Sequence, residues 1–438
     1  MKCSRNQSRR QDMKQAHNTT GRFRASAAAL CVCAATAFAA ATPAQAKGGA
    51  VNVMLFAGPI ASFTQQNLPE FEKASGIKVN LTIIGGEVIN NKTSTELLGS
   101  GTSFDVISIR GDSMPFYGTK GVLADVTPYL KDAKLTPADY DIKSIPDALM
   151  NFYRWNNKQV GMPWQVASYI TYYRKDLLQA AGLTHPPKTA DEYRSYAQKL
   201  NAPPKVYGTG LTMQKSHNLT SEYFQWLSTF GGGVIDANGK VILDSPEARQ
   251  ALEYYVSLRK FAPEDVTNWA YERLTTGLSQ GEVAMAVQWT DTAAVMLEPK
   301  QSKVAGKMAF AAAPVAKVPA AVIGGWGLTI PASSRNKEDA FRFIRWATGP
   351  AMSRKVADLG GTPFRTNLLR DKDLSAKFPW FNAQADAEEV AMPRPRTPAW
   401  PAIDDAMSTI LARVVTGGLT VEQGVTQMAA AAKKQIGN

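Results

Sequence analysis

The chain has 438 residues, of which 45% are hydrophobic and 20% are charged, and its formal net charge is +12. This length exceeds what one hydrophobic core usually supports, so we expect two domains, and the composition excludes a largely disordered protein. The positive excess is modest, and no long run of Lys and Arg follows the N-terminal region, which argues against a nucleic-acid partner.

The first 46 residues predict an export signal. A basic leader precedes a short apolar run at 25–41, and Ala44-Gln45-Ala46 has the small-x-small pattern of a cleavage site. The apolar run is too short to cross a membrane and Pro43 follows it, so we expect ordinary secretion with cleavage after Ala46 rather than an anchor. Met13 is an alternative start of translation.

Two other export routes fit the leader less well. Residues 8–10 (SRR) resemble a twin-arginine motif, but Asp12 follows where an apolar residue belongs. Cys31 and Cys33 lack the preceding small residue that lipidation needs. Because all three cysteines lie in the leader, we expect no disulfide in the mature chain. The leader holds seven basic residues and one acidic residue, so cleavage lowers the formal charge from +12 to +6.

Strands and helices alternate through the first part of the mature chain. Apolar runs and helical spacing predict strands at 51–56, 77–84 and 104–109 and helices at 63–75 and 87–98. This order favours a parallel, doubly wound sheet and therefore an α/β fold. Ligands of such sheets bind beyond the carboxyl ends of the strands, which here are 56–59, 85–90 and 110–115.

The stretch 161–178 (GMPWQVASYITYYRKDLL) is the most informative later segment. Its first glycine and proline indicate a turn, and the β-branched and aromatic residues from Ser168 to Tyr173 predict a strand. Trp164 and Gln165 stand at the mouth of this segment, where an indole and an amide suit contact with a polar ligand. Packing of Trp164 into a core is the alternative interpretation.

Helical patterns dominate the remainder of the chain. The predicted elements are helices at 176–181, 190–200, 221–230, 245–261 and 337–348, a hairpin at 234–243, a strand at 283–289 and a linker-like stretch at 310–319. Prolines interrupt the helical C-terminal region at 392–398.

The order and spacing of nine segments, spread through nearly the whole mature chain, carry a family resemblance. They are FEKASGIKVN, FDVISIRGD, GVLADVTPYL, MPWQVASYITYYRKDLLQAAGL, PKTADEY, VAMAVQWTDTA, GGWGLTIPASSRNKEDAFRFIRWAT, GGTPFR and RPRTPAWPAI. Together they resemble the extracellular solute-binding proteins of ABC sugar importers, the family that includes maltose-binding protein.

The resemblance implies a two-lobed periplasmic-binding-protein fold of type II. Each α/β lobe would hold a doubly wound sheet, and a multi-strand hinge would join the lobes. The N-terminal lobe would comprise 47–159 and 305–349, and the C-terminal lobe 160–304 and 350–438. The three implied crossings coincide with turns that the residues themselves indicate.

The resemblance also implies transport rather than catalysis. The protein would be periplasmic and would capture a carbohydrate, either a sugar or a polyol, in the cleft between its lobes. It would deliver this ligand to the permease subunits of an ABC transporter in the cytoplasmic membrane. It would act as a monomer, without a cofactor or a bound metal. A ligand that contacts both lobes would shift the equilibrium between their open and closed arrangements.

Aromatic faces stack on sugar rings, and planar polar groups hydrogen-bond the surrounding hydroxyls. The candidate site residues are therefore aromatic and polar side chains on turns at strand ends. In the N-terminal lobe they are Phe56, Glu87, Asn90, Asp112 and Trp326. In the C-terminal lobe they are Trp164, Gln165, Trp226, Trp289, Asp291, Arg365, Arg396 and Trp400.

These candidates rest on different grounds. The resemblance places ligand contacts at Asp112, Trp289 and Trp400. For Glu87, Trp226 and Arg365, the respective alternatives are a solvated helix start, a helix core and a surface turn. The first strand turn lacks a charged group, and Ile109 stands where maltose-binding protein has a ring. Both departures put a maltodextrin specificity in doubt.

Two other functions fit parts of the sequence. A secreted hydrolase is one, but the two histidines left after cleavage form no metal-binding pattern and no cysteine remains as a nucleophile. A hydrolase that uses a pair of catalytic carboxylates, as glycosidases do, remains an alternative. The second is the same fold with an anionic ligand, such as a phosphate ester or a sugar acid, held by Arg365, Arg394 and Arg396. Exposed linker charges are the alternative for Arg394 and Arg396.

Overall fold

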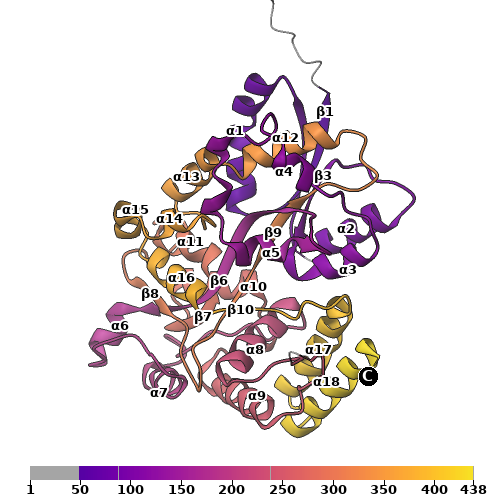
Figure 1. Ribbon diagram of the computed structural model, residues 1–438. Coiled ribbons are helices and arrows are strands. Elements are labelled where there is room, and N and C mark those ends of the chain that lie inside the picture. The colour runs from indigo at the N-terminus through magenta and orange to yellow at the C-terminus, as the bar shows by residue number, and fades with distance from the viewer. Residues whose placement is uncertain (1–48, 87, 237, 438) are drawn as a thin grey trace, which may run out of the picture. The chain divides into compact units, whose positions relative to one another are not determined.

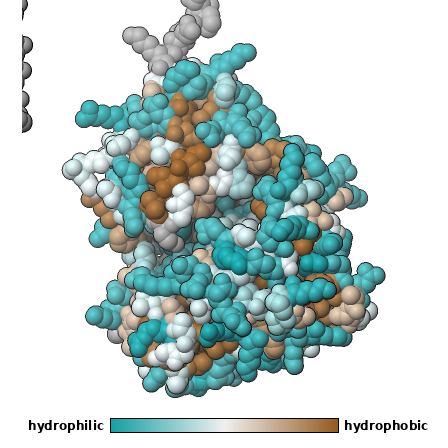
Figure 2. Space-filling model, turned by 180° about the vertical axis from the view of Figure 1, so that it is seen from behind, coloured by the Kyte–Doolittle hydropathy of each residue, from teal (hydrophilic) through white to brown (hydrophobic). Residues whose placement is uncertain are grey.

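The computed structural model describes residues 49–86, 88–236 and 238–437 (Figure 1). The predicted export signal, its cleavage site after Ala46 and the candidate residue Glu87 lie outside the described residues. Within the described ranges, no helix combines the length and the apolar character that crossing a membrane requires. The face shown in Figure 2 is mostly hydrophilic, and hydrophobic side chains gather on it mainly toward the start of the described chain.

Eight strands of the described chain form one mixed sheet, in the order β2-β1-β3-β9-β6-β7, with β10 beside β9 and β8 beside β6. They are β1 (Ala50–Phe56), β2 (Lys78–Ile84), β3 (Val106–Arg110), β6 (Met162–Arg174), β7 (Met285–Trp289), β8 (Met308–Ala312), β9 (Ala321–Thr329) and β10 (Ala391–Pro393). β1 is parallel to β2 and β3, as predicted, whereas β9 is antiparallel to both β3 and β6. The short strands β4 (Arg154–Trp155) and β5 (Lys158–Gln159) pair separately.

Helices pack around this sheet (Figure 1). The α-helices described are α1 (Pro59–Ser75), α2 (Val88–Leu98), α3 (Met114–Thr119), α4 (Thr127–Lys131), α5 (Asp147–Phe152), α6 (Lys175–Ala180), α7 (Ala190–Leu200), α8 (His217–Thr229), α9 (Pro246–Leu258), α10 (Tyr271–Gln280), α11 (Ala293–Leu297), α12 (Lys337–Ala347), α13 (Pro350–Asp358), α14 (Thr366–Leu369), α15 (Lys372–Lys377), α16 (Trp380–Glu389), α17 (Trp400–Val415) and α18 (Val421–Ile436). Single 3-10 turns follow two strand ends, η1 (Gly111–Ser113) after β3 and η6 (Thr290–Thr292) after β7.

Two hydrophobic cores divide the described residues. The first core is built around β1, β3 and α12, and the second around α8, α9 and α17. β6 and β9 contribute to both: the change of core falls between Val166 and Ala167 in β6 and between Val322 and Ile323 in β9. Ala167 pairs with Gly324 in the antiparallel ladder, so the two strands pass from one core to the other at the same level.

The predicted α/β architecture is therefore observed, with strands rather than loops joining the two cores. The lobe boundaries at 159, 304 and 349 stay a prediction. β6 is continuous from Met162 to Arg174 and is buried over nearly its whole length, as expected for a strand covered on both faces. A strand of this kind carries no turn at the point where it passes between cores, so turn residues alone do not locate the crossing.

One predicted segment differs from the structure, and another is present in a short form. Residues 308–312 form the strand β8, which pairs with residues 170–174 of β6, although 310–319 had the composition of a linker. Its alanines carry little intrinsic strand preference, and the pairing with β6 supplies the stabilisation instead. The hairpin predicted at 234–243 is present but short: the bridge between Ile235 and Val241 is flanked by backbone hydrogen bonds from Asp236 to Lys240 and from Ile242 to Val234.

Gly325 is required where β6 and β9 pass between the cores. Its φ is +153°, and an added Cβ would overlap the backbone oxygen of Gln165. Gly325→Ala should lower the free energy of unfolding by about 3 kcal/mol or more, because one of the two strands must move. Denaturant unfolding measures this. Gly101→Ala is the control: a Cβ there meets open space, so we expect a change within about 0.5 kcal/mol. Equal effects of the two substitutions would contradict the prediction.

Candidate ligand-binding site

Two adjoining cavities lie between elements of the first core and elements of the second. The smaller, of about 280 Å³, borders β6 and β9 and is lined by residues such as Gln165 and Trp289; we call it the strand cavity. The larger, of about 440 Å³, borders α2, α3 and α17 and is lined by residues such as Tyr117 and Asp404; we call it the helix cavity. The residues that line both are Asn90, Arg110, Lys215, Ser216, His217 and Trp326.

Aromatic rings form part of the wall of the strand cavity. Phe56, the last residue of β1, stacks on Trp326 of β9, with ring centroids 4.2 Å apart and an interplanar angle of 8°. Trp289, the last residue of β7, packs on Tyr169 of β6 with a centroid distance of 4.2 Å. The cavity therefore offers apolar faces to a ligand from strands of both cores.

Two hydrogen-bond acceptors in the same wall lack donors. Gln165 Nε2 donates to Asp291 Oδ2 over 3.0 Å. The other oxygen of each side chain, Gln165 Oε1 and Asp291 Oδ1, is buried and accepts no hydrogen bond from the described residues. An unpaired buried acceptor is costly, so a site that contains two is suited to a ligand that brings donors.

Burial has a marked effect on Asp291. It raises the pKa of this carboxyl to about 6, although the Tyr271 phenol and the Gln165 amide stabilise the carboxylate and act in the opposite direction. Asp291 is therefore protonated in part of the protein near neutral pH and ionised in the rest. A ligand hydroxyl that donates to it would favour the ionised form.

A buried ion network borders both cavities. Asp112, in the turn η1, contacts Arg110 Nε at 3.0 Å and Arg394 Nε at 3.2 Å. Trp400 Nε1, at the start of α17, donates to Asp112 Oδ2 over 3.2 Å. His217, at the start of α8, lies 3.9 Å from the same oxygen. This one carboxylate is thus held by side chains from β3, from the chain after β10, and from two helices of the second core.

The charges of this network are balanced. Burial alone would raise the pKa of Asp112, but the guanidinium groups of Arg110 and Arg394 and the imidazole of His217 outweigh it and hold that pKa well below its ordinary value. The second carboxylate, Asp404, has a lowered pKa for similar reasons, because His217 and Arg110 outweigh its burial. Two arginines therefore face two carboxylates in this network.

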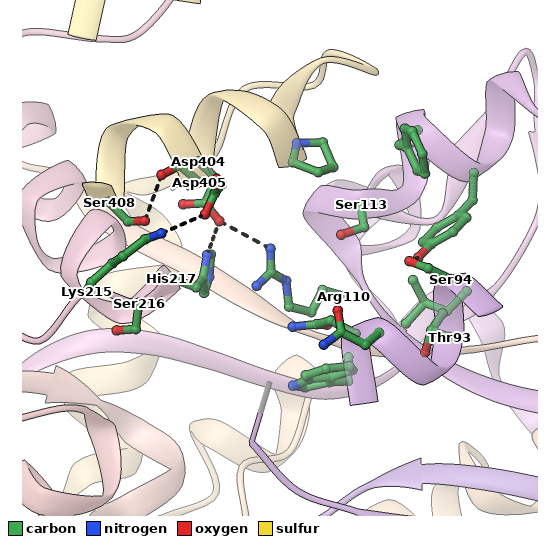
Figure 3. Close-up of a pocket in the computed structure, with 17 residues that line it drawn as sticks. Thr93, Ser94, Arg110, Ser113, Lys215, Ser216, His217, Asp404, Asp405 and Ser408 are labelled. Carbon is green, nitrogen blue, oxygen red and sulfur yellow. Dashed lines mark hydrogen bonds and ion pairs between the residues drawn. The ribbon is translucent and has the colours of Figure 1, made fainter. Parts of the chain in front are cut away.

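His217 lies between the two carboxylates, and Figure 3 shows its contact with Asp404. Its Nδ1 lies 2.6 Å from Asp404 Oδ2, and its Nε2 lies 2.7 Å from Arg394 Nη1. A guanidinium only donates, so Nε2 is the acceptor and the ring proton is assigned to Nδ1, where it reaches Asp404. Arg394 Nη1 also donates to Ser221 on the next turn of α8. Arg394 is therefore buried and paired, unlike the exposed linker charge considered from the sequence.

The structure brings together six of the thirteen predicted site residues as cavity walls. They are Phe56, Asn90, Gln165, Trp289, Asp291 and Trp326. Asp112 and Trp400 lie behind the wall: both are almost fully buried, and they bond each other instead of lining a cavity. Glu87 is outside the described residues.

Four predicted residues lie away from both cavities. Trp164 is in the first core, as its alternative interpretation stated. Trp226 is in the second core, where it packs against Tyr193 and Tyr254, so the helix-core alternative holds for this residue. Arg365 is also buried rather than on a surface turn, and its guanidinium donates to the backbone oxygens of residues 140, 141 and 348. Arg396 donates to the backbone oxygens of residues 151 and 154. Through these hydrogen bonds, Arg365 and Arg396 each hold separate chain segments together.

Several wall residues were not predicted. They are Arg110, Lys215, His217, Tyr271 and Asp404, whereas Arg394 was considered from the sequence only for an anionic ligand. Arg110 directly follows a predicted strand, at one of the strand ends where ligands were expected, so the pattern could have included it. His217 and Asp404 begin or belong to helices and are 187 residues apart, so nothing in their local sequence indicates that they meet.

Two features associated with enzymes were compared with the described residues: a nucleophilic serine in a Gly-x-Ser-x-Gly pattern and a group of metal ligands. The Gly-x-Ser-x-Gly pattern of many esterases does occur, at 277–281, but these residues end the helix α10. Ser279 is buried there and donates to the backbone oxygen of Thr276, so it is no exposed nucleophile on a strand-to-helix turn. Among the described side chains, no group of three His, Cys, Asp or Glu residues is arranged to hold a metal ion.

Comparison with known proteins agrees with this architecture. The family model described as "Bacterial extracellular solute-binding protein" matches residues 57–353. The chain belongs to this family. The solute-binding protein is 31% identical over 301 residues to a probable ABC transporter-binding protein of Deinococcus radiodurans, a match that covers 66% of this chain and 71% of that relative.

Two further comparisons concern proteins with named ligands. The solute-binding protein is 28% identical over 296 residues to a mannitol-binding protein of Pseudomonas aeruginosa, covering 66% of each chain. It also superposes with a TM-score of 0.81 on an ABC transporter solute-binding protein of Agrobacterium radiobacter solved in complex with ribitol. This chain and the Agrobacterium radiobacter protein share 27% sequence identity, and the match covers 88% of this chain and 98% of the Agrobacterium chain. The expected two-lobed α/β fold and the family resemblance are thereby confirmed.

Asp291 gives the solute-binding protein a defined dependence of stability on pH. Its folded-state pKa of about 6 lies above the unfolded value of about 3.9. The stabilisation from its protonated form is therefore fully present below about pH 4 and is lost as the pH rises through 6. Asp291→Asn removes this titration. The unfolding free energy of the variant, relative to the native protein, should rise by about 3 kcal/mol between about pH 4 and pH 8. Denaturant unfolding at several pH values tests this, and a difference that does not vary with pH would contradict it.

Proposed function

We propose that this solute-binding protein captures a neutral sugar or polyol in the strand cavity and delivers it to the permease of an ABC transporter. The observation that carries the proposal is the composition of the cavity wall: the indole of Trp289 and the Phe56–Trp326 stack stand beside two unpaired acceptors. The mannitol and ribitol named for two similar proteins support the same ligand class.

The chemistry of a polyhydroxylated ligand matches this wall. The C–H face of a sugar or polyol is apolar and packs on aromatic rings, while its hydroxyls donate hydrogen bonds. Gln165 Oε1 and Asp291 Oδ1 are acceptors without donors, and two neighbouring hydroxyls would supply them. Binding would then remove the cost of leaving both oxygens buried and unpaired.

The charge balance favours a neutral ligand over an anionic one. Arg110 and Arg394 border the strand cavity, but both are engaged by Asp112. Asp291 and Glu272 line the same cavity, and an anion would be repelled by them. Of the arginines considered for an anionic ligand, Arg365 is used to join chain segments and lies outside both cavities. Among the described residues that line the strand cavity, the third cation is Lys215, and it pairs with Asp405 at 3.4 Å.

Capture would involve movement of the two cores as lobes. The paired crossing of β6 and β9 supports a hinge there, since strands allow small twisting without losing their hydrogen bonds. The lobes would comprise 47–159 with 305–349 and 160–304 with 350–438. Near the crossing, a few residues of β6 and β9 pack in the core of the other lobe. A ligand between Phe56 and Trp289 contacts both, so it would stabilise the closed arrangement.

The remaining expectations belong to the same proposal. The family is an extracellular one, and the leader predicts export to the periplasm with cleavage after Ala46. The mature chain would act as a monomer, without catalysis, and would need no cofactor or nucleic acid. A secreted glycoside-active enzyme is the competing class, and incubation with candidate glycosides separates the two because a binder releases no product.

A thermal-shift screen of monosaccharides, disaccharides, polyols and sugar phosphates tests the ligand class. A ligand at one hundred times its dissociation constant adds about 2.7 kcal/mol of stability, which raises the melting temperature by several degrees. We expect neutral sugars or polyols to give the largest shifts, with affinities that change by less than about threefold between 50 and 500 mM salt. A sugar phosphate as the tightest ligand, with strongly salt-dependent affinity, would contradict the proposal.

Trp289 should contribute to affinity more than to folding. Trp289→Leu keeps apolar bulk but removes the ring face, so affinity for the tightest ligand of the screen should fall about tenfold or more. Trp226→Leu is the matched control, because Trp226 lines neither cavity. It should lower the unfolding free energy by about 3 kcal/mol and leave the affinity of the folded protein within about twofold. Titration calorimetry and denaturant unfolding on both variants measure this. The reverse pattern would exclude Trp289 from the site.

A further inference from the structure

Three side chains at the border of the two cavities meet at one oxygen atom, Asp404 Oδ2 (Figure 3). Asp404 Oδ2 lies 2.6 Å from His217 Nδ1 and 3.5 Å from Arg110 Nη2. Arg110 and His217 line both cavities, whereas Asp404 lines the helix cavity only. The three side chains therefore stand at the boundary between the strand cavity and the helix cavity. We call them the Arg110–Asp404–His217 partition.

The partition crosses from one core to the other. Arg110 ends β3, a strand of the first core, whereas His217 and Asp404 belong to α8 and α17, helices of the second core. Each side is held firmly from behind: Asp112 holds the Arg110 guanidinium at 3.0 Å, and Arg394 holds the imidazole at 2.7 Å. The 3.5 Å contact between Arg110 and Asp404 is the longest of these and joins the two sides.

From this geometry we propose that the Arg110–Asp404–His217 partition determines ligand length, confining bound carbohydrate to a single unit in the strand cavity. The inference rests on the proposed function. A cavity of about 280 Å³ is at the lower limit of usual ligand pockets, which suits a polyol or one sugar ring. The helix cavity, of about 440 Å³, has room for a second unit, and the partition stands at its border with the strand cavity.

The helix cavity is itself suited to hydroxyl groups. Asn91, Ser94, Ser113 and Ser408 line it, as does the phenol of Tyr117. An ion pair between this polar space and the strand cavity would give the protein a sharp preference for ligand length, because a two-unit ligand that extends between Arg110 and Asp404 breaks their contact. A single-unit ligand leaves the contact in place.

Asp404→Asn is the variant that tests the partition. The side chain keeps its shape, and its oxygen can still accept from His217 Nδ1, but the charge attraction to Arg110 is lost. Arg110 remains paired with Asp112, so no buried charge is left without a partner. Arg110→Lys tests the same contact from the other side, since a lysine keeps the charge beside Asp112 but lacks the second nitrogen that reaches Asp404.

The matched control is Asp405→Asn. Asp405 is the next residue along α17, lines the same helix cavity and pairs with Lys215 at 3.4 Å, but it lines no part of the strand cavity and pairs with no residue of the first core. It reproduces the loss of one carboxylate from the helix cavity and leaves the Arg110–Asp404 contact in place. Thermal unfolding of all three variants confirms that each is folded.

The experiment measures the affinity of the mature protein for two matched probe pairs, sorbitol with maltitol and glucose with maltose. The second member of each pair is the first with one added glucosyl unit. For the native protein we expect the single-unit probe of at least one pair to bind about 100-fold more tightly than its partner. Asp404→Asn and Arg110→Lys should each reduce this ratio by about tenfold or more, and Asp405→Asn should leave it within about twofold.

The possible failures are distinct. If neither these probes nor any neutral sugar or polyol of the thermal-shift screen raises the melting temperature of the native protein, the proposed function falls and this inference with it. If the native protein prefers a two-unit probe, the function stands and the partition inference is overturned. The inference is also overturned if the single-unit and two-unit affinities fall together in Asp404→Asn, because the contact would then only hold the two cores together.

Discussion

The carboxylate of Asp112 is the constraint on which the cleft depends. It is buried, so it persists as an ion only because Arg110, Arg394 and the indole of Trp400 compensate for its lost hydration. These partners come from a strand of the first core, from the chain after β10 and from a helix of the second core. Satisfying one charge therefore fixes the relative placement of three chain segments around the cavities.

The same pairing decides what the cleft can bind. Arginines beside a cavity usually indicate an anionic ligand, but here Asp112 and Asp404 already occupy them. The wall of the strand cavity also offers a ligand aromatic surface and two unpaired acceptor oxygens, on Gln165 and Asp291. Under the proposed function, a cleft that pairs its own cations and leaves these acceptors unpaired would favour hydroxyl donors over phosphates and carboxylates.

The position of the strand cavity links ligand contacts to the hinge. Gln165 lies two residues before the change of core in β6, and Gly324 and Gly325 adjoin the change in β9; all three border the cavity. A ligand here touches the strands where the two cores would rotate, so small displacements of these strands alter its contacts directly. The closely packed Gly325 keeps β9 against β6 at this point and limits how the strands can move apart.

The sequence by itself determined the elements and one side of the site. Alternating apolar runs defined β1, β2 and β3, and because the carboxyl ends of parallel strands meet at one edge, Phe56, Asn90 and the segment from Arg110 were expected together. Trp289 and Asp291 follow a strand in the same way. Trp164 and Trp226 show the limit of this reasoning, since an indole suits a core as well as a cleft and local sequence does not separate the two.

Tertiary structure alone decided the other side. His217, Arg394 and Asp404 come from two helix regions and a proline-rich stretch, and each has polar neighbours in sequence that are equally plausible ligands. They converge because α8 and α17 pack together in the second core and carry their first turns to η1. Contacts between residues nearly two hundred positions apart depend on how helices pack, and helix packing is set by the whole core rather than by any local pattern.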